Sequence, residues 1–302
     1  MSTATANAAC HDRPRFGLLA GWGRYPIVVA EALVRQGFDV YCIGLKDHAD
    51  RQRLTAICRD YREMGLGKLG RQIRYFRRHG VQRATMVGKV HKVTMFQPFY
   101  LLKHFPDWRT ARVCFPIWIR GKKNRTDDTL LTAVVDTFAA DGVAFVPATD
   151  FVPELLVNKG QLCGRRLSSG QRHDIEFGWT MAKKMGGLDV GQSVVVKNRT
   201  VLAVEAVEGT DQCIRRAGQL CPAGGFTVVK VAKPQQDMRF DVPTIGLGTL
   251  QTMVESGART LAVEADKTVL LDQDAVIHFA ERNGLTIIAL EQGPVAELAD
   301  AA

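Results

Sequence analysis

Short apolar runs alternate with helix-spaced apolar positions along the first half of the chain. The pattern predicts strands and helices in strict alternation, with glycine ending two of the helices. The predicted strands are 15–20, 39–44, 83–88 and 143–147, and the predicted helices are 27–36, 69–79 and 127–140. Alternation of this kind indicates a parallel sheet covered by helices on both faces. We therefore expect a Rossmann-like domain.

Glycines lie at the ends of two of these strands. Gly21 and Gly23 come after the first strand, and Gly88 ends the third. Because ligands of such sheets lie beyond the carboxyl ends of the strands, these residues are the predicted nucleotide site. The loop does not match the dinucleotide fingerprint, since Pro26 stands at its third glycine position and the second strand does not end in a carboxylate. We expect a nucleotide other than NAD.

The second half predicts another α/β unit. Residues 151–174 are rich in glycine and serine and are expected to connect the two units. Beyond them the pattern predicts helices at 175–185, 249–256 and 273–283, a hairpin of 193–196 and 201–205 turning at Asn198 and Arg199, and strands at 227–231, 260–264 and 286–290. We expect a disordered leader at 1–14, a nucleotide-binding domain at 15–150, a catalytic domain at 151–302, and the active site in the cleft between the domains.

The segment 230–249 carries the densest candidate chemistry. Asp237, Arg239 and Asp241 lie between two predicted strands. We expect this segment to be extended, with both carboxylates on one face. Carboxylate oxygens suit Mg²⁺, which proteins usually hold with one or two carboxylates plus substrate phosphates. The segment therefore predicts a metal or phosphate site; the alternative is a surface turn in which the acids neutralise their basic neighbours.

A second acidic cluster lies at 201–216. The pattern predicts a strand ending at Glu205, a turn at Gly209 and a helix that Thr210 or Asp211 caps. The free backbone N–H groups of a helix start favour an anion. Two strand-to-loop junctions that carry acids are thus expected to converge on an oxyanion and a cation.

Eight motifs occur in order between residues 15 and 290. They are GLLAGWGRYP at 17–26, VGKV at 87–90, DDTLL at 127–131, DIEFGW at 174–179, LDVGQSVVV at 188–196, VEAVEGTD at 204–211, QQDMRFDVPTIG at 235–246 and AVEADKT at 262–268. Through them the chain resembles the UDP-2,3-diacylglucosamine pyrophosphatase family of bacterial lipid A biosynthesis, the type without dinuclear metallophosphoesterase motifs. The sixth and seventh motifs are the specific ones. Asp266 and Thr126 depart from the family pattern, which usually has glycine at both positions.

The resemblance implies hydrolysis of a pyrophosphate bond. Water would attack the uridine-side phosphorus of UDP-2,3-diacylglucosamine and release UMP and 2,3-diacylglucosamine 1-phosphate, assisted by Mg²⁺ or another divalent cation. Asp237 and Asp241 would hold the metal or orient the water, with Arg239 as a third catalytic residue. The implied substrate-binding residues are Gly21, Gly23, Gly88, Lys89, Asp174, Gln192, Glu205, Gly209, Thr210, Asp211, Lys230, Lys233, Thr244, Lys267 and Thr268.

Charge is distributed unevenly along the chain. The whole sequence has a net charge of +9, yet residues 68–125 contain 15 Lys or Arg and one acid, Asp107. In the predicted helix 69–79, Arg71, Arg74 and Arg78 lie on a different stripe from the apolar residues, and an aromatic segment follows at 96–108. Basic residues mixed with aromatics favour an anionic membrane surface; the alternative is an ordinary solvated face. The motifs of zinc fingers, RNP strands and KH loops are missing, which argues against nucleic acid.

Cysteine usage and hydropathy indicate a cytoplasmic protein. The seven cysteines form no CxxC pair and are expected to be reduced thiols rather than zinc ligands. No apolar run reaches the roughly 20 residues that span a bilayer, so we expect peripheral association with the inner membrane. Two other classes stay open, a non-catalytic nucleotide-sugar sensor and a nicotinamide-dependent oxidoreductase or epimerase, and the sequence leaves open whether the chain forms a homodimer.

Overall fold

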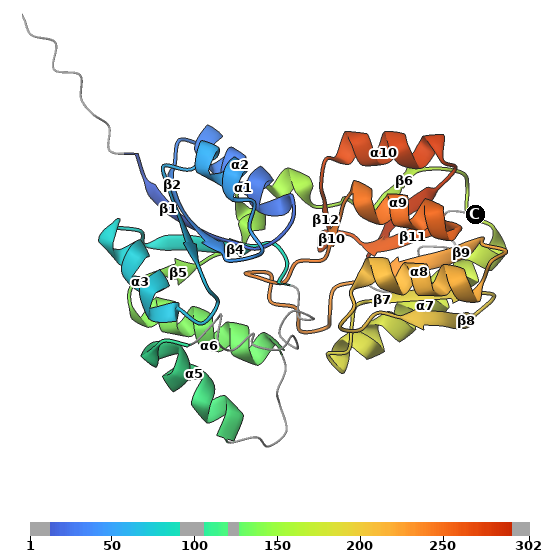
Figure 1. Ribbon diagram of the computed structural model, residues 1–302. Coiled ribbons are helices and arrows are strands. Elements are labelled where there is room, and N and C mark those ends of the chain that lie inside the picture. Colours follow the sequence, from blue (N-terminus) through green and yellow to red (C-terminus); the bar gives the residue numbers. More distant parts are fainter. Residues whose placement is uncertain (1–12, 91–105, 120–126, 292–302) are drawn as a thin grey trace, which may run out of the picture.

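Two β-sheets, each flanked by helices, divide the chain into an amino-terminal and a carboxy-terminal half (Figure 1). The computed structural model describes residues 13–90, 106–119 and 127–291. Most of the predicted leader, residues 96–105 of the aromatic segment, and Thr126 lie outside the described residues. The α/β fold class with two units is confirmed.

The first sheet is parallel throughout, with strand order β3-β2-β1-β4-β5. This order is that of a Rossmann-like sheet. Its strands are β1 (Arg15–Ala20), β2 (Asp39–Leu45), β3 (Asp60–Met64), β4 (Arg83–Val87) and β5 (Ala144–Phe145). Its helices are α1 (Tyr25–Arg35), α2 (Arg51–Ile57), α3 (Leu69–Arg78), α5 (Trp108–Ile119) and α6 (Asp127–Ala140).

Sequence periodicity missed α2, β3 and α5. The helix α2 is short and buries a single residue, Leu54, so its apolar stripe is too small to recognise. The strand β3 lies at the edge of the sheet and reads DYREM, without a fully buried position.

The strands that were predicted bury side chains on both faces of the sheet. In β1, Phe16 and Leu18 pack on the α1 side, whereas Leu19 packs on the side of α3 and α6.

The second sheet has the order β6-β13-β11-β9-β7-β8. The three central strands β13, β11 and β9 are parallel, and β6, β7 and β8 are antiparallel to their neighbours. The strands are β6 (Gly160–Cys163), β7 (Ser193–Lys197), β8 (Thr200–Val204), β9 (Phe226–Lys230), β11 (Ala258–Glu264) and β13 (Thr286–Leu290). The helices are α7 (Ser169–Gly187), α8 (Thr210–Leu220), α9 (Leu247–Ser256) and α10 (Gln273–Arg282).

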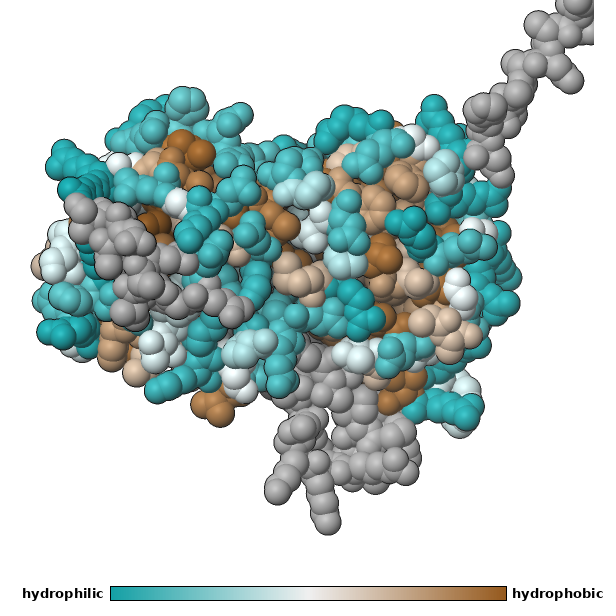
Figure 2. Space-filling view, turned by 180° about the vertical axis from the view of Figure 1, so that it is seen from behind, coloured by the Kyte–Doolittle hydropathy of each residue, from teal (hydrophilic) through white to brown (hydrophobic). Residues whose placement is uncertain are grey.

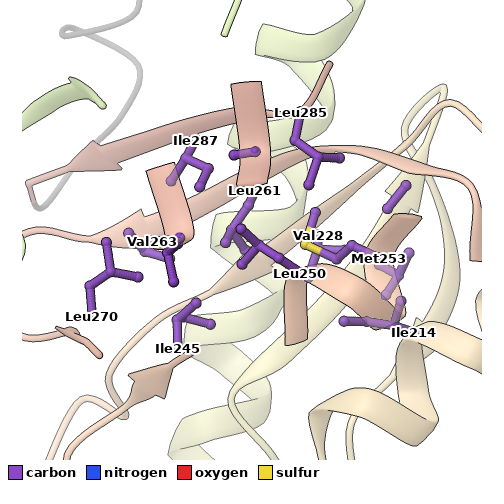
Figure 3. Packing of buried hydrophobic residues seen from close by; sticks show 14 of the residues in the cluster. Ile214, Val228, Ile245, Leu250, Met253, Leu261, Val263, Leu270, Leu285 and Ile287 are labelled. Carbon is purple, nitrogen blue, oxygen red and sulfur yellow. The ribbon is translucent and has the colours of Figure 1, made fainter. Parts of the chain in front are cut away.

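Helices cover both faces of this second sheet. On one face, Ile214 of α8 and Leu250 of α9 pack against the buried strand residues (Figure 3). Val276 of α10 belongs to the same cluster. On the other face, α7 contributes Ile175 and Trp179 to a separate cluster. The sheet is therefore buried on both sides, which explains the continuous apolar runs of its central strands.

The segment 151–174 is more ordered than its composition predicts. It contains β6 and the start of α7, which begins at Ser169 rather than at Ile175. Ser168 and Gln171 form a reciprocal capping box at the start of that helix. The predicted hairpin is confirmed, since Asn198 and Arg199 both have positive φ, as the tight turn between β7 and β8 requires.

A two-stranded sheet joins the halves, formed by β10 (Thr244–Ile245) and β12 (Val269–Leu270) (Figure 1). Val269 packs in the core cluster of the first half, whereas Ile245 and Leu270 pack in that of the second. The Arg24 guanidinium also binds the Asp272 carboxylate across the joint, with nitrogen–oxygen distances of 2.6 and 3.0 Å. The chain between β9 and β12 is thus held against both halves.

Gly21 and Gly88 pack backbone against backbone beyond the carboxyl ends of β1 and β4. A Cβ atom at Gly88 would lie 2.8 Å from the Gly21 carbonyl carbon and 2.8 Å from Pro26, and its φ is +97°. Trp22 and Lys89 exchange both backbone hydrogen bonds across this contact, at 2.8 and 2.9 Å. The requirement for glycine at 21 and 88 therefore comes from contact between the two loops. Gly23, with φ +108°, has open space where its Cβ would be.

Among the described residues, no helix combines the length and the hydropathy that crossing a bilayer requires. The molecular face in Figure 2 shows hydrophilic residues spread over both halves, with hydrophobic residues interspersed among them.

Candidate active site

The strand β9 ends in a buried lysine at the junction of the two halves. The Lys230 side chain is 2% exposed. Its Nζ donates to the Thr210 hydroxyl at 3.0 Å and to the Thr244 carbonyl at 3.2 Å. Thr210 in turn donates to the Glu205 carboxylate at 2.9 Å. We call Glu205, Thr210, Asp211, Lys230 and Thr244 the Lys230 cluster.

The loop between β8 and α8 supplies most of this cluster. Gly209, with φ +83°, is the residue before the helix, and neither Thr210 nor Asp211 caps it. The prediction of a cap at Thr210 or Asp211 was therefore wrong. Both side chains are engaged elsewhere, because Thr210 lies between Lys230 and Glu205, and Asp211 accepts from the Thr249 hydroxyl at 2.9 Å.

A charged side chain of the first half also acts on the Lys230 cluster. Burial lowers the pKa of Lys230, and the negative charges of Glu205, Asp211 and Asp241 partly oppose that change. The positive charge of Lys89 lowers the pKa further. Lys89 follows β4 of the first sheet, so side chains from both halves act on one buried amine.

The segment after Ala232 is a series of turns rather than an extended chain. The backbone N–H groups of Phe240 and Asp241 both donate to the Asp237 carbonyl. The expectation of an extended segment was therefore wrong. Phe240 packs against the apolar core of the first half, so the turns lie between the two sheets.

Asp237 and Arg239 bind each other within these turns. The Arg239 Nε lies 3.0 Å from each Asp237 carboxylate oxygen, and its Nη2 lies 2.6 Å from Oδ2. The bonds from Arg239 lower the pKa of Asp237, and the bonds to Asp237 raise the pKa of Arg239. In this conformation Asp237 neutralises a basic neighbour, which is the alternative that the sequence left open.

Asp241 lies in a separate ionic arrangement. Lys233 reaches its carboxylate at 3.4 Å and the Asp189 carboxylate at 2.6 Å. Gln236 donates to the backbone carbonyl of Asp241. Asp241 also acts on Lys230, since its negative charge opposes the lowering of that pKa. Of the two predicted metal ligands, Asp241 is therefore the one associated with the Lys230 cluster.

The donor set suits a divalent cation only in part. Within the described residues, His, Cys, Asp and Glu do not form a group of three that could hold a metal ion. Asp241 fits as one carboxylate ligand of a cation whose other ligands come from substrate phosphates and water. Asp237 does not fit in this conformation, because Arg239 occupies both of its carboxylate oxygens.

Lys267 and Thr268 follow β11. The Lys267 Nζ lies 3.0 Å from the Glu264 carboxylate, and the Lys267 side chain is 38% exposed. Thr268 is fully buried, and its backbone carbonyl accepts from Val157 at 2.9 Å. Sequence reasoning missed Glu264, although it lies within the AVEADKT motif, and it also missed Lys183, which binds the same carboxylate at 2.6 Å.

Asp174 lies away from the cluster. Its carboxylate accepts from the backbone N–H groups of Asn198 and Arg199 in the hairpin turn, at 3.0 and 2.6 Å. The register pairs Ser193, at the other end of β7, with Lys230. Four residues of strand separate the two ends, about 13 Å. Asp174 therefore stabilises the hairpin turn and does not lie at the predicted substrate site near Lys230.

The other predicted residues lie close to β9 and the joint. The backbone carbonyl of Gln192 accepts from Val231, the residue after Lys230, at 3.0 Å. Thr244 contributes its carbonyl to Lys230, while its hydroxyl donates to the Val242 carbonyl at 3.0 Å. The turn residues Gly21, Gly23, Gly88 and Lys89 lie in the first half, beyond the carboxyl ends of β1 and β4.

Comparisons with known proteins agree with this two-part arrangement. A family model described as the LpxI N-terminal domain matches residues 15–155, and one described as the LpxI C-terminal domain matches residues 158–288. The chain belongs to the LpxI family. It is similar to the UDP-2,3-diacylglucosamine pyrophosphatase LpxI of Caulobacter vibrioides, with 30% identity over 286 residues, 92% of this chain and 98% of that protein.

Both LpxI domains contribute to the surroundings of Lys230. Lys89 belongs to the part matched by the N-terminal model, and the rest of the cluster belongs to the part matched by the C-terminal model. Residues 156 and 157 lie between the two matches. Leu156 pairs with Val269 of β12, and the Val157 N–H donates to the Thr268 carbonyl directly before that strand. The family resemblance expected from the motifs is confirmed.

The Asp237–Arg239 pair gives a pH-dependent contribution to stability. Because the pKa of Asp237 is lower in the folded state, this contribution is fully present above the unfolded value of about 3.9 and is lost as pH falls through the folded value. We predict that Asp237→Asn lowers stability by about 1 kcal/mol at pH 7. Calorimetric melting of both proteins between pH 7 and pH 3 should show the difference narrowing below about pH 4. A difference that stays constant over this range would contradict the assignment.

Proposed function

We propose that the protein hydrolyses UDP-2,3-diacylglucosamine to UMP and 2,3-diacylglucosamine 1-phosphate in lipid A biosynthesis. Membership of the LpxI family supports this reaction, as does the pyrophosphatase activity for which the Caulobacter relative is named. The observation that carries the proposal is the buried, multiply hydrogen-bonded Lys230 at the junction of the two halves. A fixed positive charge in a water-poor site stabilises charge on transferring phosphoryl oxygens more strongly than one in solvent.

The two halves would divide the substrate between them. The uridine end would lie on the turn of Gly21–Gly23, beyond the carboxyl end of β1, where sheets of this order bind nucleotides. The diphosphate would then lie toward the Lys230 cluster, with Lys89 on the first half and the partly exposed Lys267 on the second. Lys233 would keep Asp241 in place through its ion pair. Phosphoryl transfer depends mainly on such positioning and charge neutralisation.

A divalent cation belongs to this proposal. When bound, Mg²⁺ or a similar ion neutralises charge on the phosphoryl oxygens and orients water. Asp241 would hold it, together with oxygens of the substrate diphosphate. Asp237 would join only after Arg239 turned from it toward the substrate, and Arg239 would then bind a phosphate.

The attacked phosphorus is the one next to uridine in our proposal. This position follows from the family resemblance and not from the arrangement of the side chains. Hydrolysis in H₂¹⁸O distinguishes the two phosphorus atoms. Label in UMP is expected, and label in the lipid product would assign attack to the other phosphorus.

Turnover of UDP-2,3-diacylglucosamine tests the proposal. We predict hydrolysis in the presence of Mg²⁺ and its loss in EDTA. At least one of Asp237→Ala and Asp241→Ala should lower turnover by several orders of magnitude. Lys230→Met should lower kcat/KM by about 100-fold, since it removes a fixed charge near the phosphates. Asp274→Asn is the matched control, because Asp274 is exposed on α10 and outside the cluster.

The alternative classes give different results in the same experiment. A nucleotide-sugar sensor would bind the UDP compound without turnover. A nicotinamide enzyme would retain a cofactor that absorbs in the near ultraviolet. Full activity of Lys230→Met would contradict the role given to the buried charge.

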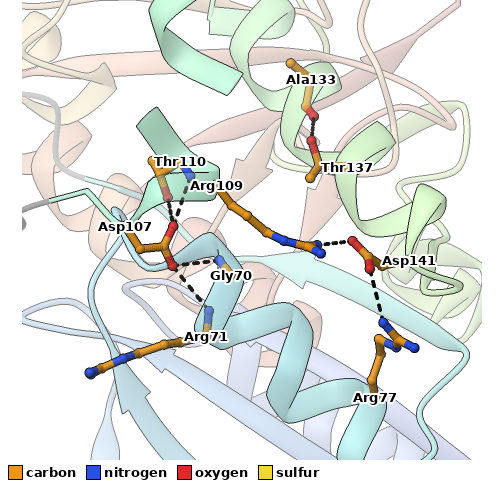
Figure 4. A network of polar contacts seen from close by, with 9 residues as sticks. All are labelled: Gly70, Arg71, Arg77, Asp107, Arg109, Thr110, Ala133, Thr137 and Asp141. Carbon is orange, nitrogen blue, oxygen red and sulfur yellow. Dashed lines mark hydrogen bonds and ion pairs between the residues drawn. The ribbon is translucent and has the colours of Figure 1, made fainter. Parts of the chain in front are cut away.

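We also propose that the protein is cytoplasmic and binds the anionic surface of the inner membrane through the first half. Arg71, Arg74 and Arg78 are exposed on α3, and Trp108 at the start of α5 is 81% exposed. Asp107 fixes α5 to α3 by accepting from the backbone N–H groups of Gly70 and Arg71, at 2.8 and 3.3 Å (Figure 4). The exposed tryptophan and the basic stripe are thus held on adjacent helices.

Not all arginines on these helices are available to a membrane. Arg77 and Arg109 both bind the Asp141 carboxylate at the end of α6 (Figure 4). Within the part of the chain that the structure describes, Arg74 and Arg78 have no carboxylate partner. Free guanidinium groups near a surface of anionic lipids contribute about 1 kcal/mol each.

Charge reversal tests the membrane surface. We predict that Arg74→Glu with Arg78→Glu abolishes sedimentation with vesicles that contain anionic phospholipid at low salt. Arg165→Glu with Lys184→Glu makes the same change in net charge on exposed residues of the second half and should leave sedimentation unchanged. Equal binding by the two double variants would contradict the proposal. Binding to RNA or DNA in place of vesicles would assign the basic stripe to nucleic acid.

A further inference from the structure

A second buried charge lies on the opposite face of the sheet from Lys230. In the register of the sheet, Lys230 pairs with Val263, whose side chain packs on the face of α8, α9 and α10. Glu264 is the next residue, so it points to the face covered by α7. Glu264 ends β11 and is 1% exposed.

The Glu264 carboxylate has three donors from three different segments. Its Oε2 accepts from the Lys183 Nζ at 2.6 Å and from the Ala232 backbone N–H at 2.8 Å. Its Oε1 accepts from the Lys267 Nζ at 3.0 Å. A carboxylate this deeply buried is retained only with strong partners, because desolvation of the charge is costly.

Lys183 and Glu264 together hold the backbone of one residue, Ala232, and we call this pair the clamp. The Lys183 Nζ donates to the Ala232 carbonyl at 2.9 Å as well as to Glu264. The N–H and the C=O of Ala232 are therefore both held by one side-chain pair, just where the chain leaves β9. Bonds of this kind fix the direction in which the next residues run, because both polar groups of the peptide backbone are satisfied.

The residues that follow the clamp are those of the proposed active site. Lys233 comes directly after Ala232 and bridges Asp189 and Asp241. Lys267 is the other lysine that binds the Glu264 carboxylate. It is partly exposed and is expected to face the diphosphate. One carboxylate between two ammonium groups leaves a net positive charge, so Lys267 keeps its attraction for a phosphate.

We propose that Lys183 and Glu264 are positioning residues for the pyrophosphatase reaction. They act through the backbone of Ala232 and through Lys267. They hold the start of the segment 232–243, and with it Asp241, and they orient Lys267. The inference rests on the proposed function, because it specifies which residues fix the geometry of that site. A displacement of reacting groups by about 1 Å is enough to cost about 100-fold in rate.

The test compares variants of two adjacent lysines on α7. Lys183→Met removes the clamp, and Lys184→Met is the control, since Lys184 is exposed on the same helix. We expect Lys183→Met to lower kcat for UDP-2,3-diacylglucosamine about 10- to 100-fold, with the Kd for UMP within twofold of the parent protein. Lys183→Arg should regain most of the activity, because a guanidinium can donate to both acceptors. Lys183→Gln keeps one donor and replaces the methionine variant if that variant does not fold.

Hydrogen exchange provides a readout that does not depend on activity. Amides of residues 232–241 should exchange faster in Lys183→Met and in Glu264→Gln than in Lys184→Met, while those of β1 remain unchanged. Unchanged exchange would show that the pair does not hold the segment. Faster exchange with kcat equal to that of Lys184→Met would show that holding it has no effect on the reaction. Absence of turnover in the parent protein and in Lys184→Met alike would contradict the proposed function instead, and the exchange result would still decide whether the clamp exists.

Discussion

The burial of one amine at the junction of two domains constrains much of this structure. Lys230 is almost completely removed from solvent, so its Nζ requires acceptors in fixed positions. A hydroxyl from the start of α8 and a carbonyl from β10 provide them. The loop after β8, the end of β9 and the joint strand β10 must therefore meet at one point. The negative charges of Glu205, Asp211 and Asp241 partly oppose the lowering of the Lys230 pKa by burial, and Asp241 belongs to the segment 232–243.

The segment 232–243, which lies between the two sheets, is held at both ends by buried charge. At its start, Lys183 and Glu264 bind the backbone of Ala232 on the α7 face of the sheet. At its end, Lys230 binds the carbonyl of Thr244 on the opposite face. Between these points Phe240 packs on the first domain, and Asp237 and Arg239 pair with each other. A segment fixed in this way presents Asp241 at a defined position while bridging two domains, which suits a reaction that depends on alignment.

Sequence patterns predicted most strands and helices of the two large sheets, but they missed α2, β3, α5 and β6. They also identified the acidic loops and the glycine turns, because these occur in distinctive motifs. The conformation of 232–243 could not be predicted, since it depends on side chains distant in sequence, Lys183 of α7 and Glu264 of β11. The position of Asp174 depends likewise on the hairpin that it caps. Glu264 was overlooked because a single acid at a strand end carries no local signal of burial.

A crystal structure with UMP and 2,3-diacylglucosamine 1-phosphate tests the central claim most directly. The account predicts that the uridine lies on the turn of Gly21–Gly23 and that the phosphates of both products lie between Lys89 and the segment 232–244, near Lys230. Product phosphates bound away from that junction, with Asp241 and Lys230 facing no ligand, would contradict it.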